Sequence, residues 1–314
     1  MPRFDTHHHM ASPRSLATLE EVGIVTRHEA AAMTAARALE DMDRGGITVA
    51  VNSTPAPPRA TLENAALGIA YARDNNDYLA QLVADHRGRF GMFAALPMPH
   101  VDATLKELAY ALDVLKADGV YLMTSYIDHW LGDQAFAPVF DELNRRKALI
   151  YTHPHSPYCC TRPLKEIVMP DAMIEFGTDT TRAIANMVLT GTAQRCPDLK
   201  IIWSHAGGTM PFLIYRFLKT AAIPANIKHF PQGIVAELKK FYYDTAQASH
   251  AVLLTALRQV VGLEHTVFGS DYPWSDSAAC WRELQDSGAL SAAEMAGIEH
   301  RNILPLLPRF ERSL

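Results

Sequence analysis

The sequence predicts a (β/α)8 TIM barrel that forms a single domain over residues 1–314. Three observations lead to this prediction: short apolar runs recur along the chain, helical patterns fill the gaps between them, and the runs number eight. Regular alternation of strands and helices is typical of a parallel sheet. Eight such units in one chain of this length favour a closed barrel over an open, doubly wound sheet.

Each predicted strand is a short apolar run that ends in turn or polar residues. Several runs are almost continuously apolar, which is typical of strands buried on both faces. In chain order, the predicted strands are 3–8, 47–52, 90–96, 119–123, 149–152, 200–204, 241–244 and 266–269.

Apolar residues at helical spacing occupy the segments between the strands. In 101–117, for example, leucines recur three to four residues apart, which places them on one helix face. Two stretches, 12–26 and 224–240, show no clear pattern and stay unassigned. The predicted helices are 30–44, 61–86, 101–117, 136–147, 179–196 and 250–261.

Composition excludes several classes of partner. The net charge is −5 and no basic stretch stands out, so a nucleic-acid partner is not expected. No apolar run approaches the ~18 residues of a membrane helix, and the first residues lack the pattern of a secretory leader. Of four cysteines, Cys159 and Cys160 are adjacent and pair poorly, although they could bind a soft metal. We therefore expect a reduced, cytoplasmic protein.

The first predicted strand ends in three consecutive histidines, His7, His8 and His9. Residues i and i+2 of a strand share a face, so His7 and His9 project together and His8 points away. Two neutral imidazoles on one face suit Zn and similar divalent metals. The alternative is a polar N-terminal arm; a purification tag fits poorly, because the triplet continues a strand-like run.

The fifth predicted strand ends at His153, because Pro154 cannot continue a central strand. His153 therefore occupies the position where a barrel presents ligands. His155 follows in the loop, where it either contacts substrate or is simply solvated.

Strands six and eight also end in polar residues. His205 precedes a glycine pair and is a candidate acid–base group or oxyanion stabiliser, with a helix cap as the alternative. Asp271 can bind a metal and exchange a proton, with an Asx-turn before Pro273 as the alternative. Asp244, after strand seven, is interpreted as a cap and stays outside the candidate site.

The joint position of these residues is more informative than any one of them. Active sites of such barrels lie at the carboxyl ends of the strands. Three histidines and one aspartate around a cation leave a coordination position open, which is typical of catalytic sites. The sequence thus predicts a metal enzyme whose ion is held by His7, His9, His153 and Asp271.

The motifs Asp5-x-His7-x-His9, His153-Pro154, His205-Ala206-Gly207-Gly208 and Gly269-Ser270-Asp271-Tyr272-Pro273 resemble those of the amidohydrolase-related (amidohydrolase 2) family. The resemblance covers nearly the whole chain. It is to the branch of 2-amino-3-carboxymuconate-6-semialdehyde decarboxylase and related metal-dependent decarboxylases. Residues 175–182 and the cysteine pair look closest to bacterial 6-methylsalicylate decarboxylase-like proteins.

The resemblance implies a role for each matching residue. His7, His9, His153 and Asp271 match the family's metal ligands, and His205 matches the histidine beside the metal. The three histidines make Zn the first choice for the one divalent ion, and the family implies Mn as the alternative.

Arg216 matches an arginine that, in the semialdehyde enzyme, enters a neighbouring subunit's site and holds the substrate carboxylate. This implies a homodimer; the alternative is a surface charge on a helix.

The chain also departs from the family pattern. Several ring-carboxylate decarboxylases carry Glu where this chain has His7, and the semialdehyde enzyme carries Trp where this chain has His155. A strand-one insertion that supplies a carboxylate-binding arginine has no clear counterpart. These departures leave the exact substrate open.

Three functions follow as hypotheses. The first is nonoxidative decarboxylation of a small aromatic (salicylate-type) or enol-type carboxylic acid, with Asp271 or His205 as proton donor and Arg216 and His155 as substrate-binding residues. The second is hydrolysis of a lactone, ester or amide, because the same ligands can activate water. The third is a barrel that binds small molecules without turnover.

Overall fold

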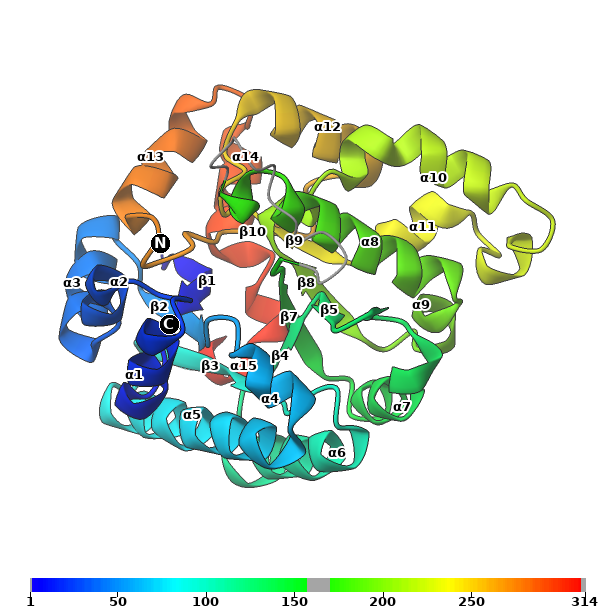
Figure 1. Cartoon of the computed structure of the whole chain (residues 1–314). Coiled ribbons are helices and arrows are strands. Elements are labelled where there is room, and N and C mark those ends of the chain that lie inside the picture. Colours follow the sequence, from blue (N-terminus) through cyan, green and yellow to red (C-terminus); the bar gives the residue numbers. More distant parts are fainter. Residues whose placement is uncertain (1, 157–169, 312–314) are drawn as a thin grey trace, which may run out of the picture.

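A barrel of eight parallel strands forms the centre of the computed structural model, which describes residues 2–156 and 170–311 (Figure 1). Neighbouring strands follow one another in chain order around the barrel. The strands are β1 (Phe4–His9), β2 (Val49–Ser53), β3 (Phe90–Ala95), β4 (Gly119–Met123), β7 (Leu149–His153), β8 (Lys200–Trp203), β9 (Tyr242–Asp244) and β10 (Thr266–Val267).

Backbone hydrogen bonds close the barrel between its first strand and the segment that follows its last. The amide of Thr6 donates to the carbonyl of Phe268, and the amide of His9 donates to that of Tyr272, both at 2.9 Å. The amide of Asp271 donates to the carbonyl of His7, also at 2.9 Å. This closure confirms the predicted (β/α)8 barrel, and it places Asp271 beside the end of β1.

Helices surround the barrel on the outside (Figure 1). A short antiparallel hairpin, β5 (Ser125–Tyr126) with β6 (His129–Trp130), follows β4. The α-helices are α1 (Pro13–Glu21), α2 (Arg27–Ala32), α3 (Ala35–Gly45), α4 (Arg59–Glu63), α5 (Ala65–Asp85), α6 (Val101–Ala109), α7 (Ala137–Arg145), α8 (Glu175–Leu189), α9 (Thr192–Arg195), α10 (Ile214–Ala221), α11 (Ile234–Leu238), α12 (Ala251–Val261), α13 (Ser277–Asp286), α14 (Ala292–Ala296) and α15 (Pro308–Glu311).

Three of the predicted helices are each divided in two. The predicted helix 179–196 is divided into α8 and α9 at Gly191, whose φ is +79°. The predicted helix 30–44 is interrupted before Thr34, whose hydroxyl accepts from the amide of Arg37 and starts α3. The predicted helix 61–86 breaks at Asn64, whose side chain caps the amide groups at the start of α5. The breaks at Thr34 and Asn64 occur at residues that favour N-caps over helix interiors, because their side chains compete for backbone hydrogen bonds.

The two unassigned stretches contain short helices. The stretch 12–26 holds α1, which Ser12 caps and Pro13 begins. The stretch 224–240 holds α11 and one turn of 3-10 helix. Such short segments carry too few residues for a clear helical period.

Aromatic side chains fill the barrel below the strand ends. The Tyr151 ring stacks on Phe93 with centroids 5.2 Å apart, and its edge meets the His7 ring at 5.3 Å. All three side chains are fully buried. The aromatic packing therefore supports the end of β1 from below and closes that side to solvent.

Other predictions concern the cysteines and the membrane. Cys159 and Cys160 lie outside the described residues, whereas Cys196 and Cys280 are buried thiols. Among the described residues, no helix combines the length and apolar character that crossing a bilayer requires.

Candidate metal centre and substrate cavity

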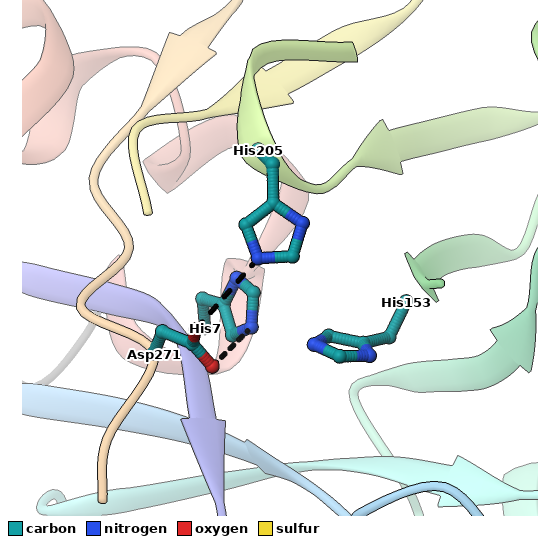
Figure 2. A group of neighbouring side chains, drawn as sticks. All are labelled: His7, His153, His205 and Asp271. Atoms are coloured by element: carbon teal, nitrogen blue, oxygen red, sulfur yellow. Dashed lines mark ion pairs between the residues drawn. The ribbon is translucent and has the colours of Figure 1, made fainter. Parts of the chain in front are cut away.

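Four polar side chains converge at the carboxyl ends of the strands (Figure 2). His7 comes from β1 and His153 is the last residue of β7. His205 follows β8 after Ser204, and Asp271 lies four residues after the end of β10. Each offers one ligand atom, and these atoms lie within 4.8 Å of one another.

His9 joins the same cluster from β1. Its Nε2 lies 3.1 Å from Nε2 of His7 and 3.5 Å from Oδ1 of Asp271. The fold therefore brings together the four predicted metal ligands and His205, the histidine predicted to lie beside the metal. His8 points away, as predicted, and stacks on Tyr272 with ring centroids 4.4 Å apart.

The outer ring nitrogens of the three strand histidines all face acceptors. Nδ1 of His7 lies 2.8 Å from a carboxylate oxygen of Asp244. Nδ1 of His153 lies 2.7 Å from the carbonyl of Pro154, and Nδ1 of His9 lies 3.3 Å from that of Thr54. A carbonyl or carboxylate oxygen only accepts, so each Nδ1 donates and each Nε2 is the nitrogen left to bind a metal.

One carboxylate oxygen of the cluster lacks a hydrogen-bond donor. Oδ1 of Asp271 is buried and accepts no regular hydrogen bond from the described residues, although His7 Nε2 lies only 3.1 Å away. A buried acceptor without a donor is costly, and a cation would satisfy it. Three imidazole nitrogens and one carboxylate oxygen are a donor set that fits a divalent metal.

Burial and mutual charge set the ionisation of the cluster. Burial lowers the pKa of His7, but the charges of Asp244 and Asp271 outweigh burial and raise it to about 10. Burial raises the pKa of Asp271, but the charge of His7 and the nearby ring nitrogens of the other histidines bring it well below its ordinary value. Burial, together with His9 and His7, lowers the pKa of His153 well below its usual range. An ionised Asp271 and a neutral His153 are the forms that bind metals, and a metal would displace the second proton that His7 carries in the metal-free cluster.

His205 occupies a strained turn directly above the cluster. Its φ is +53° and that of Ala206 is +54°, a region that residues other than glycine rarely adopt. A side chain at the following Gly208 would collide with the carbonyl of Gly177, so the turn requires glycine there. His205 Nε2 lies 3.7 Å from Oδ2 of Asp271, and its buried Nδ1 has no partner among the described residues.

A cavity of about 730 Å³ opens above the cluster. His153, His205 and Asp271 form its polar floor. This volume lies within the usual range for small-molecule sites. Its walls are mostly apolar and include Ile24, Ala56, Phe176, Phe212, Leu253 and Trp274.

The two predicted substrate-binding residues lie away from this cavity. His155 Nε2 lies 2.9 Å from the carbonyl of Ser125, and His155 is not among the described residues that line the cavity. Arg216 is exposed on α10 and also lies outside that lining. Its predicted role requires a neighbouring subunit, and both roles stay predictions.

Several residues at the site escaped the sequence analysis. Phe176 and Trp274 are aromatic wall residues that no strand-end pattern could reveal. Gln247 lines the cavity and donates to Asp271 at 3.4 Å, from a turn with φ of +53°. Asp244 ends β9, so the strand-end pattern could have revealed it, but it was interpreted as a cap.

A parallel barrel with a histidine–aspartate cluster at its strand ends defines a candidate metal-dependent enzyme of the (β/α)8 class. A family model described as Amidohydrolase matches residues 4–309. The chain belongs to this amidohydrolase family.

Curated relatives and solved structures resemble the chain over most of its length. The 6-methylsalicylic acid decarboxylase of Penicillium expansum is 32% identical over 321 residues, covering 99% of this chain and 98% of that protein. The decarboxylase yanB of Aspergillus niger is 30% identical, covering 99% and 89%. The 5-carboxyvanillate decarboxylase of Sphingomonas paucimobilis superposes with a TM-score of 0.86 at 20% identity, covering 98% and 99%.

A further solved structure holds a metal. The dihydroxybenzoic acid decarboxylase of Polaromonas, with bound manganese and 2-nitroresorcinol, superposes with a TM-score of 0.81 at 22% identity, covering 98% of this chain and 97% of that one.

Proposed function

We propose that this protein is a metal-dependent nonoxidative decarboxylase, a carboxy-lyase, of a small aromatic carboxylic acid of the salicylate type. The observation that carries the proposal is an apolar cavity whose floor is a ready metal-binding cluster. An enol-type acid is the second substrate class. The full-length similarity to aromatic-acid decarboxylases supports the reaction type.

In this proposal His7, His9, His153 and Asp271 hold one divalent ion. When bound, the ion supplies Lewis-acid stabilisation to the carboxylate and the neighbouring hydroxyl of the substrate. The three histidines favour Zn, whereas the manganese in the Polaromonas structure supports Mn as the alternative.

The reaction then needs one proton at the ring carbon. The bond between that carbon and the carboxylate breaks, CO2 leaves, and the electron pair stays on the ring carbon. A proton taken up from water reaches this carbon through Asp271 or His205, because both groups face the cavity floor. The apolar walls exclude water and strengthen these electrostatic interactions.

We also propose a homodimer of single-domain, cytoplasmic subunits. Large apolar side chains are exposed along α10 and its flanks, including Tyr215 at 67%, Phe212 at 55% and Ile227 at 55%. A second subunit on this face would cover them and would bring Arg216 near a neighbouring cavity. His155 is proposed to contact the substrate.

Hydrolysis of a lactone, ester or amide is the alternative, because the same cluster can activate water. A panel of salicylate-type acids and lactones separates the two reactions. Decarboxylation releases CO2 and the corresponding phenol, whereas hydrolysis releases acid from the lactone. Acid release from lactones with no CO2 from any acid would contradict the proposal.

A further inference from the structure

Asp244 stands behind the metal cluster, on the side of His7 away from the cavity. It is the last residue of β9 and is fully buried. Its carboxylate meets three separate segments of the chain. The two oxygens have different partners: one contacts the ring of His7, and the other contacts the backbone turn that carries His205.

Oδ2 of Asp244 faces the ring of His7. It accepts from His7 Nδ1 at 2.8 Å, with the Tyr151 hydroxyl at 3.4 Å. Since a carboxylate has no proton to donate, His7 must carry its proton on Nδ1. Nε2 is then the nitrogen of His7 that faces His9 and Asp271, where a metal would bind.

Oδ1 of Asp244 holds the turn that carries His205. It accepts from the backbone amide of His205 at 2.7 Å and from that of Ala246 at 3.1 Å. The His205 backbone has a positive φ, which persists only when the surroundings impose it. The amide contact to Asp244 supplies part of that restraint.

We propose that Asp244 is a positioning residue that sets the ligating nitrogen of His7 and the place of His205 through one carboxylate. Metal binding and the acid–base group are then linked through a side chain that touches neither metal nor substrate. The inference rests on the proposed function, because it requires that the cluster binds a divalent ion.

The substitution Asp244→Asn separates the effect on the His7 ring from the effect on the His205 turn. The Asn carbonyl oxygen can still accept the two backbone hydrogen bonds that Oδ1 of Asp244 accepts, so the His205 turn is retained. The Asn NH2 group takes the place of Oδ2 and presents an N–H donor to His7 Nδ1. His7 Nδ1 must then accept that hydrogen bond. The proton of His7 moves to Nε2, and the ligating lone pair is lost.

The matched control is Asp41→Asn. Asp41 is also buried and accepts from Ser277, but it lies on α3, which packs against α13 outside the barrel. Affinities for Zn²⁺ and Mn²⁺ are measured by competition with a chromophoric chelator, beside the thermal midpoint of each variant. We expect Asp244→Asn to weaken metal binding by about 10- to 100-fold, and Asp41→Asn by less than about 2-fold.

Folded Asp244→Asn protein with wild-type metal affinity would overturn the inference. Wild-type protein that binds neither ion would instead overturn the proposed function, so the two failures are distinct.

If Asp244→Asn does not fold, the wild-type protein still provides the test. In zinc-loaded protein labelled with ¹⁵N-histidine, we expect a slowly exchanging proton on His7 Nδ1, assigned through its contact with the Tyr151 ring. The absence of a protected proton on that nitrogen would overturn the inference.

Discussion

His7 Nε2 and His9 Nε2 lie 3.1 Å apart at the end of β1, and both rings are fully buried. Their Nδ1 atoms face acceptors, so both Nε2 lone pairs point into the same small volume. Two acceptors at this distance repel unless a proton or a cation lies between them. The pair therefore requires a proton or a bound cation in this volume, which is where the proposed divalent ion would lie.

The ligand set can be tested by comparing His9→Ala with His205→Ala. We expect His9→Ala to lose most of its metal, because His9 supplies one of the proposed ligand atoms. We expect His205→Ala to keep about one metal per chain but to lose activity. Metal content by plasma mass spectrometry distinguishes them, and metal loss in His205→Ala with retention in His9→Ala would assign His205 as the ligand.

Asp271→Asn tests the proton donor and metal ligand. Asn adopts positive φ more readily than most residues, so the backbone of position 271 at φ +69° is preserved. We expect turnover to fall by at least about 100-fold, since general acid–base catalysis typically contributes ~10²–10⁴-fold. The rate of CO2 release is the measurement, and unchanged turnover would exclude Asp271 from catalysis.

Phe176→Leu tests the apolar wall. The Phe176 ring meets the His153 ring with centroids 5.9 Å apart, beside the cavity floor. An aromatic contact contributes about 0.5–1.5 kcal/mol beyond its buried area, so we expect KM for an aromatic acid to rise about 3- to 10-fold. Since the cluster is untouched, kcat should change little. A loss confined to kcat would mean that Phe176 does not bind the ring.

Glu294→Gln tests the pH dependence of stability. Arg258 donates to this carboxylate at 2.7 Å and lowers its pKa from 4.5 to about 2. Because the folded-state pKa is depressed, the stabilisation is complete above about pH 4.5 and is lost as the pH falls toward 2.

Both partners of this pair are about one-third exposed, so the stabilisation is only about 0.5–1 kcal/mol. We expect urea unfolding at pH 7 to show that deficit in Glu294→Gln, and the deficit to shrink between pH 4.5 and 3. A deficit that stays constant over this range would contradict the assignment.

The barrel could be predicted from the sequence because the apolar patterns of strands and helices depend only on residues that are neighbours in the chain. The predicted strand 119–123 coincides with β4, and the other seven differ from the observed strands by one or two residues at their ends. Helix ends were less predictable, because Thr34 and Asn64 interrupt long apolar patterns with caps.

The candidate site was predictable where residues lie near the carboxyl end of a strand or in the few residues after it. His7, His9, His153, His205 and Asp271 satisfy that rule and converge. Phe176 belongs to α8 instead, and only the packed structure places it at the cavity. Asp244 satisfied the rule, but its contact with His7 depends on the neighbouring strands.

The most direct test of the account is CO2 release from 6-methylsalicylate and related acids by wild-type and His153→Ala protein. Each is stripped with a chelator and then supplied with Zn²⁺ or Mn²⁺. We predict that wild-type protein releases CO2 only after metal is restored, and that His153→Ala neither retains the metal nor regains activity. CO2 release by chelator-treated protein, or full activity in His153→Ala, would contradict the account.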